Sequence, residues 1–141
     1  MFFGSTLQKG LSLIEIMIVL AIMGIFATLV GPRVFSYYGK AKVQTTEANL
    51  RTLKQAITSF HIDTGRYPET LQDLMRKPFD ETVARKWQGP YLESKNEEVP
   101  EDGWGNEFVY RRNEPGSAKP YDLYSYGPDG EDSSEENWIY A

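Results

Sequence analysis

The sequence predicts an α+β fold in which a long N-terminal helix packs on a small antiparallel β-sheet. Three observations lead to this prediction. An apolar run over residues 11–31 continues into an amphipathic helical pattern over residues 34–63. Two segments of alternating polarity, residues 107–112 and 121–126, are typical of strands. The Pro115-Gly116 pair between them is a turn signal.

The composition is that of a small folded protein without thiol chemistry. The 141 residues are 40% hydrophobic and 25% charged, and the net charge is −5. A negative chain has no electrostatic support for binding nucleic acid. The absence of cysteine excludes disulfides and thiolate metal sites. With His61 as the one histidine, His-based catalysis and multi-His metal sites are disfavoured, and we expect His61 to be a surface or capping group.

The apolar run over residues 11–31 is long enough to cross a membrane. As a helix rising about 1.5 Å per residue it measures roughly 30 Å, the thickness of the hydrocarbon core. A signal peptide is disfavoured, because the helical pattern continues past Gly31-Pro32 and no small-x-small cleavage site is present. A plain anchor remains open, but Glu15 stands inside the run, and a carboxylate in hydrocarbon needs a partner.

A partner for Glu15 would arise if the chain were cleaved after Gly10. The new α-amino group would then stand at Leu11, where it could pair with Glu15 of a neighbouring copy.

The segment Lys9-Gly10-Leu11-Ser12-Leu13-Ile14-Glu15 resembles the prepilin peptidase site of type IV pilins and pseudopilins. The resemblance implies cleavage between Gly10 and Leu11, N-methylation of Leu11, and an assembly role for Glu15. Leu11 replaces the phenylalanine usual in the family. Pro32 resembles a recurrent pilin feature, and proline lacks the amide donor that a helix interior needs, so we expect a kink or local loosening there.

The amphipathic half of the helix is expected to end at about residue 63. Gly65 is suited to a left-handed cap, and Pro68 prevents the helix from continuing beyond it. Its expected core face comprises Val34, Tyr37, Tyr38, Ala41, Ala48, Leu53, Ala56, Ile57 and Phe60. A short helix is expected over residues 70–76, followed by a loop over residues 79–92. In that loop we expect Trp87 and Tyr91 to be packed aromatics.

The segment Val99-Pro100-Glu101-Asp102-Gly103-Trp104-Gly105-Asn106 resembles the Pro-x-Asp-Pro-Trp-Gly-Asn turn of pseudopilins. Gly103 replaces the usual proline, which loosens the turn but keeps Asp102 and Trp104.

The loop over residues 126–138 is acidic and contains no Lys or Arg. Its carboxylates repel one another, so an ordered loop needs either a cation or full solvation. Oxygen ligands without sulfur or imidazole favour Ca²⁺, although a solvated surface loop remains the other interpretation. The acidic residues are Asp129, Glu131, Asp132, Glu135 and Glu136.

The same loop resembles the loop in which the major pseudopilins of type II secretion systems bind one structural Ca²⁺. The resemblance implies ligation by the Asp129 side chain and by the carbonyls of Tyr126 and Glu131. The loop is shorter than in the family, so the remaining ligands are left open among Asp132, Ser133, Glu135 and Glu136.

Together these resemblances imply a non-enzymatic subunit of the type II secretion pseudopilus, a short periplasmic filament that drives export of folded proteins. Its parts would be a leader (1–10), a membrane and assembly helix (11–31), an amphipathic helix (32–63) and a globular head (64–141). The implied partners are further copies, minor pseudopilins, the assembly platform and the prepilin peptidase. The chain would cross the bacterial inner membrane once and carry its head in the periplasm.

Two alternatives remain open at this point. One is a type IV pilus pilin, with the same assembly in a surface fibre. The other is an anchored periplasmic binding module or enzyme, in which Trp87, Trp104 and Trp138 form a sugar-stacking face and paired acids act as in glycosidases.

Overall fold

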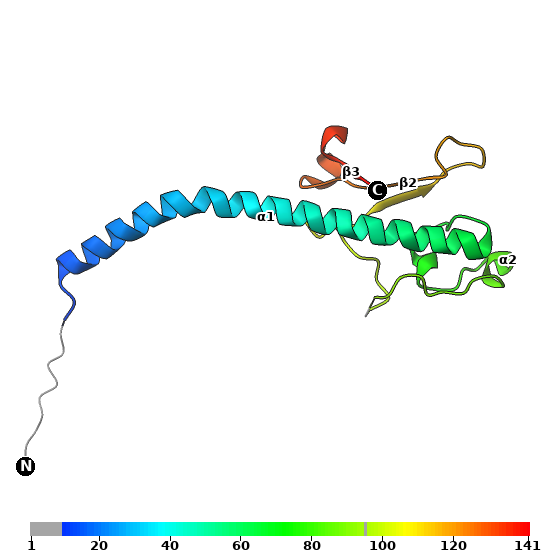
Figure 1. Ribbon diagram of the computed structural model, residues 1–141, viewed down its shortest axis with the longest axis horizontal. Coiled ribbons are helices and arrows are strands. Elements are labelled where there is room, and N and C mark those ends of the chain that lie inside the picture. The colour runs from blue at the N-terminus through cyan, green and yellow to red at the C-terminus, as the bar shows by residue number, and fades with distance from the viewer. Residues whose placement is uncertain (1–9, 95) are drawn as a thin grey trace, which may run out of the picture. The chain divides into compact units, whose positions relative to one another are not determined.

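The computed structural model describes residues 10–94 and 96–141, apart from the side chains of residues 32–36. Most of the expected leader, residues 1–9, lies outside this description. The chain divides into two compact units, Met1–Gly39 and Lys40–Ala141. We call the second the C-terminal unit; its helices and strands are labelled in Figure 1.

Helix α1 spans Leu13–Thr64, which confirms the long helix expected over residues 11–63. In the C-terminal unit its buried face consists of residues three or four positions apart, as an amphipathic helix requires. These residues are Thr46, Leu50, Leu53, Ile57 and Phe60, each at most 1% exposed.

The expected core face was wrong at its N-terminal end. Tyr37 and Tyr38 are 72% and 67% exposed, and Ala41 and Ala48 are also exposed. The buried stripe begins instead at Thr46, because the turn at Gly103 packs on the helix there and donates a hydrogen bond to the Thr46 hydroxyl.

Helix α1 ends where the sequence predicts. Gly65 has φ of 75°, and its amide donates to the His61 carbonyl over 2.8 Å. This left-handed residue closes the last turn of the helix. The His61 ring lies half-buried and stacks on Tyr67 with centroids 4.1 Å apart, so it is a packing group rather than a cap.

Short helical turns follow α1. The helix expected over residues 70–76 is a 3₁₀ turn, η1 (Leu71–Leu74), and the expected loop contains α2 (Glu81–Ala84). The Asp80 carboxylate caps α2 by accepting from the Thr82 amide at 2.8 Å. Trp87 and Tyr91 are packed aromatics as predicted, in edge-to-face contact at 5.9 Å.

The described residues form an antiparallel sheet of order β1-β2-β3. Strands β1 (Val109–Arg112) and β2 (Tyr121–Ser125) confirm the two predicted strands, with Val109 opposite Tyr124. Strand β3 (Ile139–Tyr140) was not predicted and pairs with the end of β2. Strand β2 buries Leu123 and Ser125, and Phe108, just before β1, is also buried.

Tyr110 joins β1 to the segment after α1. Its hydroxyl donates to the Pro68 carbonyl over 2.7 Å, and burial raises the pKa of this hydroxyl, so it stays a donor at any ordinary pH.

The turn at Asp102 and Gly103 connects α1 to the sheet. The buried Asp102 carboxylate accepts from the amides of Trp104 and Asn106, both at 2.9 Å, and from the Ser125 hydroxyl at 2.6 Å. The Gly103 amide donates to the Thr46 hydroxyl at 2.9 Å. A side chain at position 103 would overlap the Lys42 carbonyl. Glycine at this position therefore permits a close approach of the turn to the helix.

We predict that Gly103→Ala lowers the stability of the C-terminal unit by about 1–3 kcal/mol, the usual cost of forcing extra volume into a packed site. The measurement is thermal unfolding of the full chain in detergent, followed by near-ultraviolet circular dichroism. Gly39→Ala is the matched control, because a side chain there meets open space and alanine favours helix. If Gly103→Ala melts at the wild-type temperature, the close approach does not constrain the turn.

Candidate functional site

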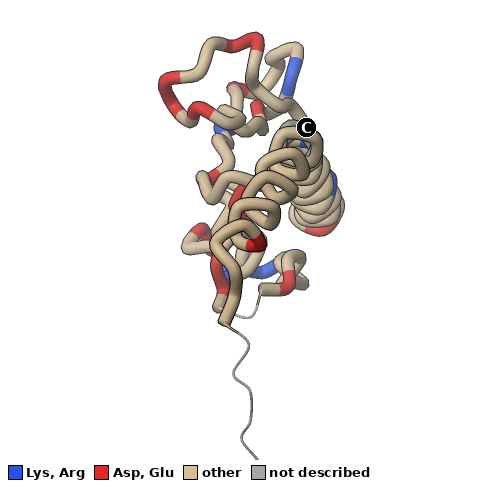
Figure 2. The backbone as a smooth tube through the Cα atoms, turned by 90° about the vertical axis from the view of Figure 1, so that its left-hand side faces the viewer, with Lys and Arg blue, Asp and Glu red and all other residues tan. Residues whose placement is uncertain are grey.

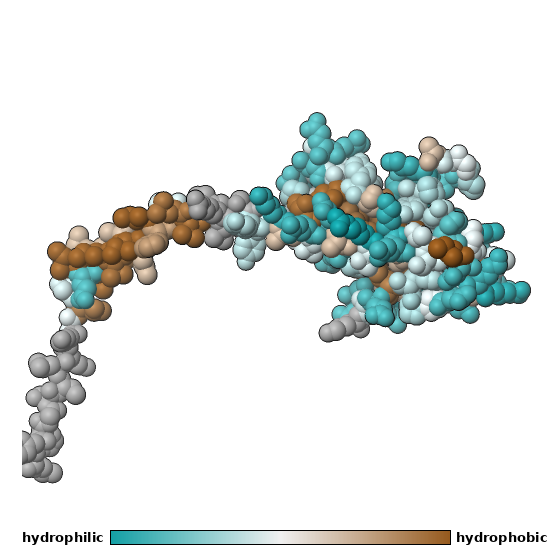
Figure 3. Space-filling view, in the orientation of Figure 1, coloured by the Kyte–Doolittle hydropathy of each residue, from teal (hydrophilic) through white to brown (hydrophobic). Residues whose placement is uncertain are grey.

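The apolar segment of α1 is exposed along its whole length. Among the described residues, one helical stretch, Leu13–Gly31, is long and apolar enough to cross a membrane, with mean hydropathy 2.7. Every residue from Leu11 to Val30 is exposed. Figure 3 shows this segment as mostly hydrophobic (brown), interrupted by a few hydrophilic (teal) atoms near its N-terminal end, whereas hydrophilic residues dominate the C-terminal unit. Such a surface must be covered by lipid or by another protein chain.

The expected processing site lies just before the helix. Gly10, Leu11 and Ser12 have no regular structure, and α1 begins at Leu13. Leu11 is 72% exposed. A peptide bond that is exposed and outside a helix is accessible to a peptidase without unwinding of the helix.

Glu15 lies in the first turn of α1 and is exposed within the apolar segment. None of the ion pairs in the described part of the chain includes Glu15. The position near a helix N-terminus favours a negative charge, yet it does not replace a cationic partner in hydrocarbon. The pairing with a neighbouring copy that the sequence suggests stays a prediction.

Pro32 lies inside α1, and the helix is continuous through Gly31 and Pro32. The expected loosening does not interrupt the helix. Proline lacks the amide that would donate to the carbonyl four residues earlier, and the loss of this one hydrogen bond does not end the helix.

The acidic C-terminal loop folds into two short turns, η2 (Gly130–Asp132) and η3 (Glu135–Asn137). Figure 2 draws its acidic positions as red segments of the backbone tube. All the candidate carboxylates are exposed: Asp129, Glu131, Asp132, Glu135 and Glu136. Among the described residues, no three acidic or imidazole side chains gather closely enough to hold one metal ion.

Ser133 and Tyr126, two of the expected ligand residues, contact each other directly. The buried Ser133 hydroxyl donates to the Tyr126 carbonyl over 2.5 Å. That carbonyl is one of the oxygens that the resemblance assigns to Ca²⁺. As arranged, the loop does not present the expected ligand set, and calcium binding stays a prediction.

Sequence reasoning missed the residues that order this loop. Trp138 stacks on Tyr124 with centroids 4.6 Å apart, and Ser125 accepts a hydrogen bond from the Gly127 amide at 3.0 Å. The sequence did contain a signal for the tyrosine side of the Trp138 contact, because alternation along residues 121–126 puts Tyr124 and Tyr126 on one side of the strand. The partners of Ser125 carry no local signal.

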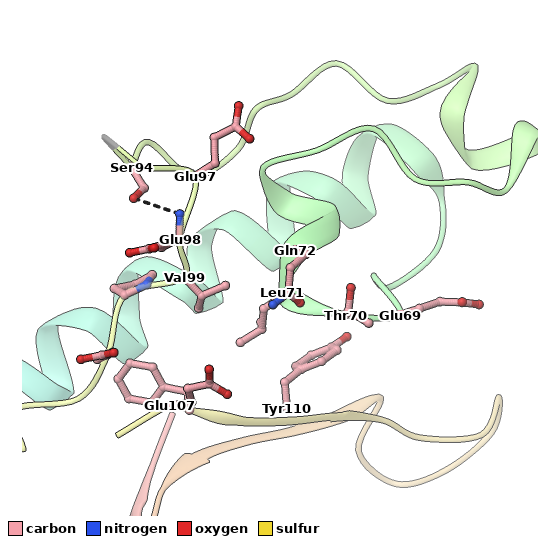
Figure 4. A pocket seen from close by; sticks show the side chains of 13 residues that line it. Glu69, Thr70, Leu71, Gln72, Ser94, Glu97, Glu98, Val99, Glu107 and Tyr110 are labelled. Carbon is pink, nitrogen blue, oxygen red and sulfur yellow. Dashed lines mark hydrogen bonds between the residues drawn. The ribbon is translucent and has the colours of Figure 1, made fainter. Parts of the chain in front are cut away.

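The C-terminal unit carries an open groove of about 790 Å³ between η1, the segment before Asp102 and the start of β1 (Figure 4). Among its lining residues are Glu69, Glu97, Glu98 and Glu107, and two of these are paired with arginines, Glu97 with Arg76 at 2.9 Å and Glu69 with Arg112 at 3.1 Å. The described residues of the lining include no serine–histidine or cysteine–histidine pair for nucleophilic catalysis.

The three tryptophans do not form the sugar-stacking face considered above. Trp87 packs on Tyr91 and donates to the Asp73 carbonyl at 2.9 Å, whereas Trp138 packs on Tyr124. No ring pair in the described part of the chain joins two tryptophans.

Two family models match this chain. Residues 33–139 match the type II secretion system protein G family, and residues 6–31 match the prokaryotic N-terminal methylation motif. The second match covers Gly10, Leu11 and Glu15, and the first covers the acidic loop.

Individual relatives agree with these matches. The chain is 37% identical to the type II secretion system core protein G of Pseudomonas aeruginosa over 92% of this chain and 90% of the relative. It is 38% identical to the type II secretion system core protein G of Xanthomonas campestris, over 87% of this chain and 80% of the relative. Among solved structures, it resembles the major pseudopilin of the type 2 secretion system of enterohaemorrhagic Escherichia coli. The TM-score is 0.58 and the identity 27%, over 77% of this chain and 92% of the other. The chain therefore belongs to the protein G family of the type II secretion system, the family of the major pseudopilin.

Proposed function

We propose that this chain polymerises through its apolar helix into the periplasmic pseudopilus that drives export of folded proteins. The observation that carries the proposal is the exposed apolar surface from Leu11 to Val30, placed on the same continuous helix that supplies the core of the C-terminal unit. Burial of that surface against the same surface of other copies is a strong, non-directional driving force. The family matches support a structural role in type II secretion.

Before assembly, the same helix holds the precursor in the inner membrane as a single span. Lys9, on the N-terminal side of the span, favours a cytoplasmic N-terminus and so a periplasmic C-terminal unit. The prepilin peptidase then cleaves between Gly10 and Leu11, and the new Leu11 amine is methylated. The methylation-motif match supports this processing.

Assembly pairs the amine that processing creates with the Glu15 carboxylate. The methylated Leu11 amine remains a cation, and it precedes Glu15 by four residues, about 6 Å along the axis if the helix extends to Leu11. A neighbouring copy that presents this amine to Glu15 neutralises both charges within the apolar core of the filament. An unpaired charge buried there is strongly unfavourable, so the pair also fixes the register between copies.

The proposed role is structural rather than catalytic. The carboxylates of the acidic loop are exposed, and the buried Asp102 carboxylate is held by the Ser125 hydroxyl and two backbone amides. The described residues that line the open groove between η1 and β1 include no nucleophile–base pair. The proposed partners are further copies of this chain, minor pseudopilins, the inner-membrane assembly platform and the prepilin peptidase.

Processing provides the first test. We expect wild-type protein from cells with the peptidase to have the mass of a chain that begins at N-methyl-Leu11. Gly10→Val should leave the uncleaved precursor, because a branched side chain at this position obstructs the peptidase. Gly4→Val, inside the leader, is the matched control and should be cleaved normally. A mature chain that begins beyond Gly31, or one that never loses residues 1–10, would overturn the proposal.

Glu15→Leu separates membrane insertion from assembly. Removing the carboxylate makes the span more apolar, so insertion and cleavage should persist. Assembly should fall at least tenfold, because the neighbour's amine is left without a partner. The measurement is the yield of sheared or cross-linked filaments beside the amount of cleaved chain, with Ile18→Leu as an apolar control in the same helix. Wild-type filament yield for Glu15→Leu would show that the charge pair does not direct assembly.

A further inference from the structure

Two exposed tyrosines, Tyr37 and Tyr38, lie on α1 shortly after its apolar segment. Their side chains are 72% and 67% exposed, although the helical pattern of the sequence predicts them to be core residues. We propose that these two tyrosines form an interfacial anchor, in which both rings lie among phospholipid headgroups and fix the depth of the helix in the bilayer. The inference rests on the proposed function, because it requires the apolar segment to span a membrane before assembly.

The position of the tyrosines along the helix matches the depth of the headgroup layer. The stretch that is long and apolar enough to cross a membrane ends at Gly31. The backbone of Tyr37 lies about 9 Å farther along the axis, at about 1.5 Å per residue. Long side chains of a helix lean over the turn that precedes them, which brings both rings back toward the span. They thereby enter the headgroup layer, which is about 5–8 Å thick on each side of the hydrocarbon core.

The two rings are free to contact lipid. Among the described residues, none of the aromatic pairs includes Tyr37 or Tyr38. A tyrosine suits the headgroup layer because its ring is apolar and its hydroxyl can hydrogen-bond to water or to a phosphate. Tyrosine and tryptophan are accordingly enriched at both membrane–water interfaces.

The arrangement of the rings around the helix favours lipid over a single protein surface. Successive residues of an α-helix are about 100° apart around the axis, so Tyr37 and Tyr38 project on different sides. A protein partner that docks on one side of the helix covers one of the rings well and leaves the other in water. Lipid surrounds a helix that crosses a bilayer and contacts both.

The surface on the N-terminal side of the tyrosines already requires an apolar covering. Every residue from Leu11 to Val30 is exposed, and the tyrosines follow on the same continuous helix. An interfacial layer of aromatic residues is expected at this end of such a span, because interfacial side chains set the depth and tilt of a membrane helix.

The charges of the neighbouring sequence also favour phospholipid. Between Glu15 and Glu47 the sequence contains three basic residues, Arg33, Lys40 and Lys42, and no acidic residue. Basic residues near a membrane surface are attracted to anionic headgroups, within the range that salt screening allows. The sequence around the tyrosines therefore carries no carboxylate that the phosphates would repel.

The test uses tryptophan as a depth probe in the full chain, reconstituted as single subunits in vesicles of phosphatidylcholine and phosphatidylglycerol. Tyr37→Trp and Tyr38→Trp keep an aromatic ring with a polar group and so preserve the anchor. The emission that either change adds to the wild-type signal should be quenched more by lipids brominated near the headgroup than by lipids brominated near the tail ends. Phe79→Trp is the matched control, because position 79 is fully exposed in the C-terminal unit, and its emission should be quenched by aqueous iodide alone.

Ile22→Trp separates this inference from the proposed function. Ile22 lies within Leu13–Gly31, so lipids brominated deep in the tails should quench its emission. If no brominated lipid quenches it, the proposed membrane span fails, and the inference fails with it. If Ile22→Trp is quenched but the tryptophans at positions 37 and 38 respond only to iodide, the span holds and the interfacial anchor is overturned. Equal quenching of Phe79→Trp by the shallow lipids would also overturn it.

Removing both rings tests whether they fix the depth of the helix. In Ile22→Trp, the further changes Tyr37→Ser and Tyr38→Ser should broaden the range of lipid depths that quench the tryptophan, because the helix can then shift and tilt. Phe79→Ser in the same background should leave the quenching profile unchanged. A profile that stays unchanged without the two tyrosines would show that they do not anchor the helix.

Discussion

The uncovered apolar surface of the first part of α1 is the constraint on which the other features depend. From Leu11 to Val30 every residue is exposed, and a surface of this length and composition is not stable in water. It has two available coverings, the bilayer and other copies of the same helix. Both coverings suit a subunit that is held in a membrane and then assembled into a pseudopilus. In the proposed assembly, Glu15 favours the second covering because a neighbouring copy supplies a cation.

The C-terminal unit depends on Ser125 as a junction. This buried residue lies at the end of β2, donates to the Asp102 carboxylate at 2.6 Å and accepts from the Gly127 amide at 3.0 Å. One side of the junction leads through Gly103 to Thr46 on α1, and the other leads into the acidic loop. Helix, turn, sheet and loop are thus joined by short polar contacts around one hydroxyl, in a unit that has no cysteine for a disulfide.

Features with a local cause were predictable from the sequence. The length of α1, its end at Gly65, and the alternation in β1 and β2 all follow from residue spacing and turn chemistry. Features that depend on residues far apart in the sequence were not predictable from it. Thr46 joins the core because Gly103, far along the chain, donates to it. Strand β3 has two residues, too few for a pattern. The acidic loop carried a cation signal by composition, but the pairing of Ser133 with Tyr126 depends on how its turns fold.

The most direct test of the account is the structure of the assembled filament by electron cryomicroscopy, at a resolution that shows side chains. The account predicts that the apolar helices form the filament core, and that the Leu11 amine of one copy lies within about 4 Å of the Glu15 carboxylate of another, the range of an ion pair. A filament in which the apolar helices do not contact one another, or in which Glu15 faces water without an amine beside it, would contradict the account.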